Sequence, residues 1–364
     1  MKEIRQIIER YESTDFDKEK IAIATVVNVE ESSYRRIGAR MLVSSSGHWI
    51  GGISGGCLEG DALRRSQKAI YNEASSRVVY DTMDDDANQI GVGLGCNGRL
   101  EVLFTPIIPD DDNNPIEKLK KIKEKDSPSV LITIIDVVTS EDLLGKSVIA
   151  SELQGDFLGI SKDQIQELIG ETLSKKRSQI FELTGAQEEP LKVLFEFIRP
   201  EMKLIVIGDN YDVSALVGIV AELGWDIYIV GRKKKIPKST FAKAKGVLEY
   251  EEYHQLNIDE YTSVLLMSHD YNWDMHILRQ VLEQKPSYLG MLGPKKRMIK
   301  MQGEKGLAGL SEVHFLHSPI GLDIGAETPE EIAISILAEI LSVFRNRDGS
   351  QLKYRPGTIH ERHR

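Results

Sequence analysis

The amino-acid sequence predicts an α/β protein with two domains, an amino-terminal α+β domain followed by a doubly wound parallel sheet. The chain has 364 residues, which is too long for one ordinary hydrophobic core and suits two domains of about 150 to 200 residues each. Hydrophobic residues make up 41% of the chain and charged residues 28%, a composition typical of folded globular proteins. Near Pro200 the pattern changes from strands joined by glycine-rich connections to strands that alternate with helices.

The amino-terminal half begins with apolar residues at helical spacing, which predicts an amphipathic helix over the first fifteen or so residues. A strand rich in β-branched residues is expected over 21–29. Further strand-like runs occupy 77–82, 100–106 and 130–138. We therefore expect an α+β domain over residues 1–198.

The carboxyl-terminal half alternates strands and helices. A buried-strand pattern over 203–207, helical spacing over 213–223 ended by Gly224, and a second strand over 226–230 predict a β-α-β unit. Strands over 263–267 and 287–291 continue the alternation. This order favours a Rossmann-like, doubly wound parallel sheet over residues 199–348, followed by a polar tail at 349–364.

The last helix, expected over 328–344, has the clearest boundary. Thr328 suits the N-cap, Pro329 the first helical position, and Glu331 completes a capping box. These residues predict where the helix begins, independently of its apolar pattern.

The formal net charge of −10 argues against a nucleic-acid partner, which would need a clustered basic face. The first residues alternate charged and apolar side chains, unlike a signal peptide or a membrane span. No later stretch approaches the roughly 18 uninterrupted apolar residues of a membrane helix. We therefore expect a cytoplasmic protein without membrane segments.

The most informative segment is a glycine-rich loop around Cys57, with the sequence Gly51-Gly52-Ile53-Ser54-Gly55-Gly56-Cys57-Leu58-Glu59-Gly60. Glycine lets backbone N–H groups turn toward a ligand because no side chain blocks the approach. The residues that follow have helical spacing, so Cys57 is expected near a helix N-terminus, where the positive potential lowers a thiol pKa and favours bound anions.

A second glycine-rich loop contains Cys96, the other cysteine of the chain, in Gly91-Val92-Gly93-Leu94-Gly95-Cys96-Asn97-Gly98. If the two loops meet across the sheet, both sulfur atoms face one ligand. The alternative is that both cysteines are small residues that fill tight turns. A structural zinc site is a poor rival, because two isolated thiols lack paired CxxC or CxxH spacing.

The dinucleotide fingerprint G-x-G-x-x-G is damaged in the carboxyl-terminal domain. After the strand at 203–207 the chain reads Gly208-Asp209-Asn210-Tyr211-Asp212, so asparagine replaces the second glycine. Asp209 and Asp212 add negative charge where a pyrophosphate would lie. Gly208 is a candidate cofactor contact, and a bound nucleotide stays an open alternative.

Other candidate contacts lie near the ends of the later strands. His269 and Asp270 follow the strand at 263–267, on the crevice side of a parallel sheet. His317 and Asp323 flank a Pro-Ile-Gly turn and are assigned to the same crevice, with a hydrogen-bonded structural histidine as the alternative. A basic anion site, with surface charge as its alternative, is expected at Gly293, Lys295, Lys296 and Arg297.

The two cysteine loops resemble the xanthine dehydrogenase accessory protein family (XdhC/CoxI), whose members carry Gly-Gly-Cys-x-Glu and Gly-Leu-Gly-Cys-x-Gly signatures. The matching runs are Gly55-Gly56-Cys57-Leu58-Glu59 and Gly93-Leu94-Gly95-Cys96-Asn97-Gly98. The carboxyl-terminal half is similar to the nucleotide-fold domain of that family through residues 268–270, 288–293 and 317–331.

The resemblance implies that the chain is a chaperone rather than an enzyme. It would bind the molybdenum cofactor (molybdopterin) as cargo, support its sulfuration with a cysteine desulfurase, and deliver it to a xanthine-dehydrogenase-type apoenzyme. Cys57 and Cys96 would be thiolate ligands of the thiophilic molybdenum, and a homodimer is expected from the family. The loop residues assigned to the cofactor are Gly52, Ser54, Gly55, Gly56, Cys57, Glu59, Gly93, Gly95, Cys96 and Gly98.

Two other functions stay open from the residues alone. One is an NAD(P)-dependent oxidoreductase built on the Rossmann-like domain, which the acidic turn at Asp209 and Asp212 opposes. The other is a nucleotidyl or sulfur transferase that acts on the pterin, with Cys57 carrying a persulfide.

Overall fold

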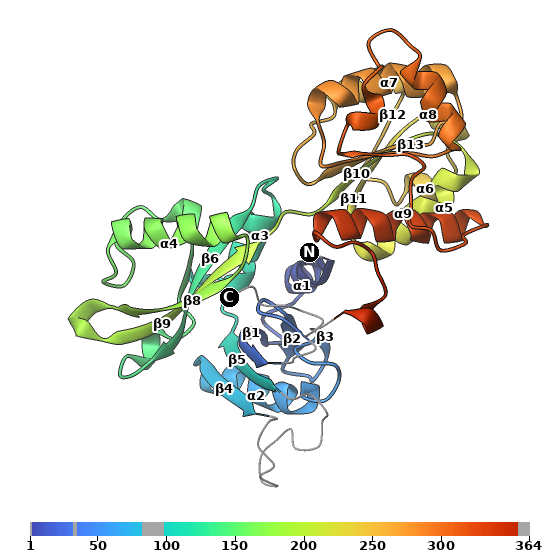
Figure 1. Ribbon diagram of the computed structural model, residues 1–364. Helices are drawn as coiled ribbons and strands as arrows, with labels where there is room; N and C mark the ends of the chain where they lie inside the picture. Colours follow the sequence, from blue (N-terminus) through green and yellow to red (C-terminus); the bar gives the residue numbers. More distant parts are fainter. Residues whose placement is uncertain (1, 32–34, 82–97, 356–364) are drawn as a thin grey trace. The chain divides into compact units, whose positions relative to one another are not determined.

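A computed structural model describes residues 2–31, 35–81 and 98–355 of the chain (Figure 1). The chain divides into two compact units, Met1–Pro200 and Glu201–Arg364. None of the helices in the described ranges has the length and apolar composition needed to cross a bilayer.

The first unit contains a five-stranded antiparallel sheet in the order β3-β2-β1-β5-β4. Side chains of successive residues in β1 point to opposite faces, so Ala24 and Val26 pack under helix α2 while Ile21 and Ile23 pack under helices α1 and α3. The elements are α1 (Lys2–Glu12), β1 (Ile21–Glu31), β2 (Arg40–Ser44), β3 (Trp49–Gly51), α2 (Glu59–Asn72), β4 (Ser76–Asp81), β5 (Gly98–Pro106) and α3 (Pro115–Lys123).

A second, four-stranded antiparallel sheet completes this unit, in the order β7-β6-β9-β8. Of its four strands, only β6 was expected from the sequence, as the run over 130–138. Val27 and Leu103 of the first sheet share a small core with Ile135 and Leu194 of the second. The elements are β6 (Ser129–Val137), β7 (Ser147–Ile149), α4 (Lys162–Lys175), β8 (Gln179–Thr184) and β9 (Pro190–Ile198).

A buried lysine of this unit gives a pH-dependent stability. Lys118 on α3 is 7% exposed and donates to the Ser147 hydroxyl at 3.2 Å, and its burial lowers the pKa of its amine from 10.5 to about 8. Between these values the unfolded chain holds a proton that the native chain has released, so the free energy of unfolding rises with pH from about 8 to 10.5. Below pH 8 both states are protonated, and the buried charge lowers the stability.

We therefore expect Lys118→Met to stabilise the unit by roughly 2–3 kcal/mol at pH 7 and to remove the gain at higher pH. Urea unfolding at pH 7 and pH 10 measures both effects, with Lys68→Met, at an exposed lysine of α2, as the control. An unchanged midpoint for Lys118→Met at both pH values would contradict the prediction.

The second unit contains a six-stranded parallel sheet in the order β12-β11-β10-β13-β14-β15. The chain starts in the middle at β10, moves outward through β11 and β12, and returns to the other side at β13, which is the strand order of Rossmann folds. The prediction of a doubly wound parallel sheet is therefore confirmed. The elements are β10 (Lys203–Ile207), α5 (Tyr211–Leu223), β11 (Asp226–Val230), α6 (Lys238–Phe241), β12 (Gly246–Leu248), β13 (Thr262–Leu266), α7 (Tyr271–Gln284), β14 (Tyr288–Met291), α8 (Lys295–Gln302), β15 (Leu316–His317) and α9 (Pro329–Phe344).

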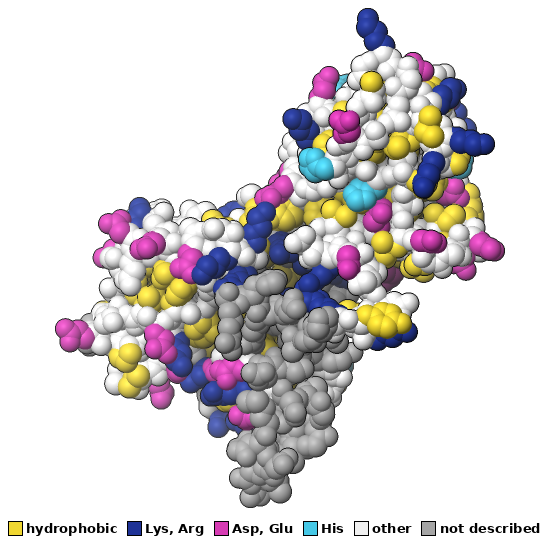
Figure 2. Space-filling view, in the orientation of Figure 1, with side chains coloured by type: hydrophobic (Ala, Val, Ile, Leu, Met, Phe, Trp, Pro, Cys, Tyr) yellow, Lys and Arg dark blue, Asp and Glu magenta, His cyan; other side chains and the backbone are white. Residues whose placement is uncertain are grey.

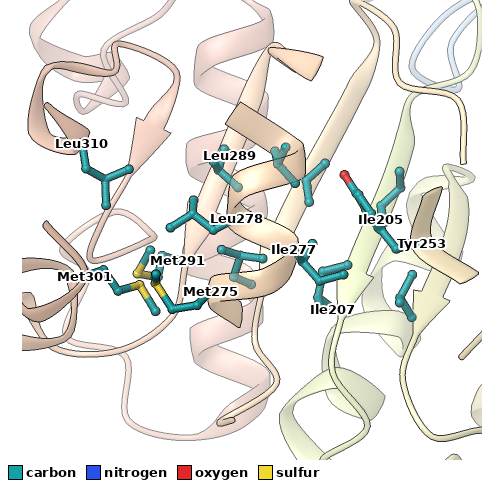
Figure 3. Close-up of a cluster of buried hydrophobic side chains, with 14 of the residues drawn as sticks. Ile205, Ile207, Tyr253, Met275, Ile277, Leu278, Leu289, Met291, Met301 and Leu310 are labelled. Carbon is teal, nitrogen blue, oxygen red and sulfur yellow. The ribbon is translucent and has the colours of Figure 1, made fainter. Parts of the chain in front are cut away.

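Hydrophobic cores cover both faces of this sheet. On one face α7 and α8 pack over the strands, where Met275, Met291 and Met301 gather beside the aliphatic side chains (Figure 3). On the other face α5 and α9 lie side by side over the strands (Figure 1). Acidic and basic side chains are interspersed on the visible surface of this unit (Figure 2).

The ends of two helices show how far local sequence sets the boundaries. Helix α9 begins at Pro329 with Thr328 and Glu331 in a capping box, as the sequence predicts. Helix α5 begins at Tyr211, two residues before the expected 213, because the Asn210 side chain accepts a hydrogen bond from the Val213 N–H and caps it.

Candidate functional site

The Cys57 loop joins β3 to α2 at the end of the sheet where β1 and β4 also end. Strands β1 and β3 both pair antiparallel with β2, so they run in the same direction. At this end Glu31 of β1 lies opposite Gly98 of β5, and the Tyr80 hydroxyl of β4 donates to Asp61 of α2 at 2.8 Å. The first turn of α2 is therefore held beside the last residues of β4.

The second predicted loop lies between β4 and β5. Gly93, Gly95 and Cys96 fall outside the described residues, so the expected convergence of the two sulfur atoms stays a prediction. Gly98 is described: it is buried and begins β5. Since Asp81 pairs opposite Arg99, the two described flanks of this segment lie next to each other at the end of the sheet that carries the Cys57 loop.

Ser54 and Glu59 organise the Cys57 loop from within. The Glu59 carboxylate accepts from the Ser54 N–H at 2.9 Å and from the Ser54 hydroxyl at 2.5 Å. The Ser54 hydroxyl oxygen in turn accepts from the N–H groups of Gly56, at 3.2 Å, and Leu58, at 3.0 Å. These amides are therefore engaged inside the loop, which leaves fewer N–H groups for an anion than the glycine content suggests.

The Glu59 carboxylate is ionised at neutral pH. Burial acts to raise its pKa, but hydrogen bonds from the Ser54 hydroxyl, the Ser54 N–H and the backbone of Glu59 and Leu58 together lower the pKa below its usual value. A fixed negative charge therefore lies at the first residue of α2, where the helix dipole stabilises it.

We expect Glu59→Gln to loosen this loop. The neutral amide loses charge-assisted hydrogen bonds worth about 1–2 kcal/mol, so the amide protons of Ser54, Gly56 and Leu58 should exchange with solvent about tenfold faster. Amide hydrogen exchange measures this, with Glu9→Gln at an exposed position of α1 as the control. Unchanged protection in Glu59→Gln would show that the carboxylate does not hold the loop.

The loop is also held by Glu3 of α1 and by Arg35, two residues that sequence reasoning missed. The Glu3 carboxylate accepts from the Gly52 N–H at 3.1 Å and from the Arg35 guanidinium at 2.8 Å, and Arg35 also donates to the Gly52 carbonyl at 3.0 Å. Gly51 leaves no room for a Cβ atom, which would lie 2.3 Å from the Arg40 carbonyl oxygen. No local pattern could reveal these contacts, because Glu3 lies 49 residues from Gly52.

Cys57 itself is exposed and precedes the N-terminus of α2. It lies two residues before Glu59, the first helical residue, and the N-cap residue Leu58 makes no side-chain cap. Gly56 beside it has φ of 112°, and a Cβ atom built there would meet nothing within 4 Å, so the backbone here can be approached closely. The arrangement presents an accessible thiol at a helix N-terminus, which suits a soft metal or an electrophilic sulfur. The exposure of Cys57 weighs against the alternative that it is a small residue filling a tight turn.

In the second unit, the side chains of the turn after β10 form hydrogen bonds with neighbouring backbone groups. Asp209 accepts from the Arg232 N–H at 3.0 Å, and Asn210 donates to the Met267 carbonyl at 2.5 Å. Gly208 has φ of 152° and lies against Met267, where a Cβ atom would be 2.7 Å from the carbonyl oxygen. Gly208 therefore allows close packing of β10 and β13, and the Asn210 cap engages a helix N–H that a pyrophosphate would otherwise use.

His269 and Asp270 lie at the carboxyl end of β13, next to this turn. His269 adopts the left-handed conformation with φ of 59°, and its Nε2 atom lies 3.1 Å from the Asp212 carboxylate. Asp270 is the N-cap of α7 and accepts from the N–H groups of Asn272 and Trp273. The structure thus brings together Gly208, Asp212 and His269 at the switch point of the sheet.

The predicted anion site at α8 is connected to the end of β13 through Asp274, which contacts both Arg297 and Ser268. The Arg297 guanidinium donates to Asp274 at 2.5 Å, and the Ser268 hydroxyl donates to the same carboxyl group at 2.5 Å. Burial raises the pKa of Asp274 above its usual range despite these donors. Gly293 has φ of 128°, and Lys295 and Lys296 are exposed at the start of α8, so only Arg297 is held in place.

His317 and Asp323, which the sequence assigned to the same crevice as His269, make different contacts. The His317 ring stacks on Tyr288 with ring centroids 4.4 Å apart, and its Nδ1 atom lies 3.5 Å from Glu339 of α9. Glu339 also accepts from the Gly321 N–H at 2.9 Å. His317 therefore belongs to a hydrogen-bonded cluster with α9, and no described contact joins it to His269. Asp323 is exposed in the loop before α9.

The described residues contain no cluster of three or more His, Cys, Asp or Glu side chains arranged to bind a metal ion. The exposed thiol of Cys57 is of the donor type that a soft metal prefers.

Comparisons with known proteins find similar sequences for both units. Residues 204–340 match the model of the XdhC Rossmann domain, and residues 17–81 match the model of the XdhC and CoxI family. A Bacillus subtilis (strain 168) protein, named as a probable subunit of xanthine dehydrogenase, is 28% identical over 329 residues, which cover 89% of this chain and 93% of that protein.

Two further relatives cover nearly the whole chain. The Escherichia coli (strain K12) protein named molybdenum cofactor insertion chaperone PaoD is 23% identical over 323 residues, covering 88% of this chain and 82% of that protein. A crystal structure of a xanthine dehydrogenase from Bacillus halodurans superposes with a TM-score of 0.75 at 27% identity, covering 97% of this chain and 98% of that one. With one family model matched in each unit, the chain belongs to the XdhC and CoxI family.

Proposed function

We propose that the chain binds the molybdenum cofactor as cargo, protects it, supports its sulfuration, and delivers it to a xanthine-dehydrogenase-type apoenzyme. The observation that carries the proposal is the exposed thiol of Cys57 at the N-terminus of α2. Molybdenum favours sulfur ligands, so an accessible thiol in an open loop suits it. The name of the relative PaoD, a molybdenum cofactor insertion chaperone, supports the same role.

The cargo site that we propose is centred on the Cys57 loop, with Cys96 as a second thiolate ligand. Ser54 and Glu59 keep the loop in shape, and the amides that they do not engage are available to the phosphate of the pterin. A cysteine desulfurase would supply the sulfur atom, and the chain would act as a homodimer.

In this proposal the Rossmann-like domain either has a structural role or binds the cargo, and in neither case does it bind NAD(P). Asp209 and Asp212 place negative charge at the turn after β10, and Asn210 caps α5, which disfavours the pyrophosphate of NAD(P). The nicotinamide-dependent oxidoreductase is therefore the weaker alternative.

A transfer experiment tests the proposal. The chain is loaded with molybdenum cofactor, freed of excess by gel filtration, and mixed with a cofactor-free xanthine dehydrogenase and a sulfur donor. We expect xanthine oxidation to appear faster than with the same amount of free cofactor. If the loaded chain transfers no more than free cofactor, or if the chain alone oxidises substrate with NADP, the chaperone role is wrong.

A further inference from the structure

A cavity of about 430 Å³ lies on the α1 side of the first sheet, at the opposite end of β3 from the Cys57 loop. Its volume falls in the range of small-molecule sites, about 300–1,000 Å³. The lining side chains are Arg10, Ile21, Leu42, Ser44, His48, Trp49 and Ile50. The cavity is thus built from α1 and from β1, β2 and β3 of one unit.

The walls of the cavity suit a flat apolar ring. Ile21 and Leu42 are 1% and 2% exposed and belong to the core beneath α1, so they form a fixed aliphatic floor. The Trp49 indole is 52% exposed on the edge strand β3, although tryptophan is a costly side chain to leave in water. A planar ligand packed against Trp49 would cover this apolar surface.

A chain of hydrogen bonds at the rim engages the Nδ1 atom of His48. The Ser46 hydroxyl lies 2.5 Å from Glu19 and 3.0 Å from the His48 Nδ1 atom. The hydrogen bond from Ser46 lowers the pKa of the Glu19 carboxyl, so this group is ionised at neutral pH and can only accept. Ser46 therefore gives its single proton to Glu19 and accepts from His48 Nδ1–H, so Nδ1 is engaged within the protein and Nε2 is the ring nitrogen that a ligand would contact.

Arg10 supplies donors on another part of the rim. Its guanidinium pairs with Glu19 and donates to the Thr14 hydroxyl at 3.4 Å, which uses two of its five N–H groups. Within the described part of the chain its other N–H groups have no protein partner. Because Glu19 neutralises the charge of Arg10, a ligand needs no negative charge, only an acceptor such as a carbonyl oxygen.

From these features we propose that the cavity is a binding site for a neutral, fused heteroaromatic lactam. The ring stacks on Trp49, its N–H donates to His48 Nε2, and its carbonyl oxygen accepts from Arg10. This site is separate from the Cys57 loop and does not depend on the proposed cargo role, because the two share no lining residue.

Quinazolin-4-one is a suitable probe, and isothermal titration calorimetry of the full chain measures its binding. We expect saturable binding with one site per chain and a dissociation constant below 1 mM, a threshold corresponding to about 4 kcal/mol. The matched compound 3-methylquinazolin-4-one lacks the N–H donor and should bind at least tenfold more weakly. Trp49→Ala and His48→Ala should each weaken quinazolin-4-one at least tenfold.

Two variants serve as controls. Tyr71→Ala removes an aromatic side chain that is 88% exposed on α2 of the same unit and should leave the affinity unchanged. Cys57→Ala should also leave it unchanged, which separates this site from the cargo site. His48 is exposed, so its substitution tests the proposal even if Trp49→Ala does not fold. Absence of saturable binding, equal affinity for the two probes, or full affinity in both His48→Ala and Trp49→Ala would overturn the proposal.

Discussion

Cys57→Ala should abolish retention of the molybdenum cofactor while the protein stays folded. The thiol is exposed and packs against no core, so its removal costs little stability, whereas a soft metal loses a sulfur ligand. We expect the bound molybdenum and pterin to fall at least tenfold relative to wild type. Metal analysis and pterin fluorescence of the purified proteins, at equal protein concentration, measure this loss.

Two comparisons make the Cys57 result specific. Ser174→Ala, at an exposed position of α4, should retain the cofactor at the wild-type level. Cys96→Ala should lose it to a similar extent if both thiols bind one cargo. Wild-type retention in Cys57→Ala, with the thermal midpoint also unchanged, would remove the thiolate assignment.

Arg40→Met should destabilise the first unit by about 3–5 kcal/mol. Arg40 and Glu196 are 4% and 6% exposed and pair at 2.6 Å, which links β2 of one sheet to β9 of the other. Arg40 also donates to the Gly38 carbonyl at 2.7 Å. Removing the guanidinium leaves the Glu196 carboxylate buried without its cationic partner, and this cost exceeds the loss of the pair itself.

The double variant Arg40→Met/Glu196→Met separates these terms and should recover most of the lost stability, because both charges are then absent. Trp49 is the only one of the three tryptophans that lies in the first unit, so urea unfolding in a Trp225→Phe/Trp273→Phe background reports on that unit. If the double variant were no more stable than Arg40→Met, the ion pair would stabilise the unit by more than the cost of burying its two charges.

The sequence predicted those parts of the fold that depend on neighbouring residues. Thr328, Pro329 and Glu331 define the start of α9 within one turn, and Gly224 ends α5 in the left-handed conformation. The β-α-β spacing after residue 203 was enough to predict the parallel sheet, since helices must cover both of its faces.

The parts that were not predicted depend on residues far apart in the chain. In the second sheet of the first unit, β9 pairs with both β6 and β8, and no turn signature marks these pairings. Arg40 and Glu196 are 156 residues apart, and Glu3 and Gly52 are 49 residues apart. The position of the Cys57 loop could be predicted from its glycines. The hydrogen bonds from Ser54 to Glu59 could not, because they depend on where α2 begins.

The identity of the small molecule that copurifies with the wild-type chain tests the central claim most directly. Protein isolated from cells supplied with molybdate should carry pterin and molybdenum in equal amounts, and alkylation of Cys57 should release both. A bound nicotinamide dinucleotide in their place, or retention of the pterin after complete alkylation of Cys57, would contradict the account.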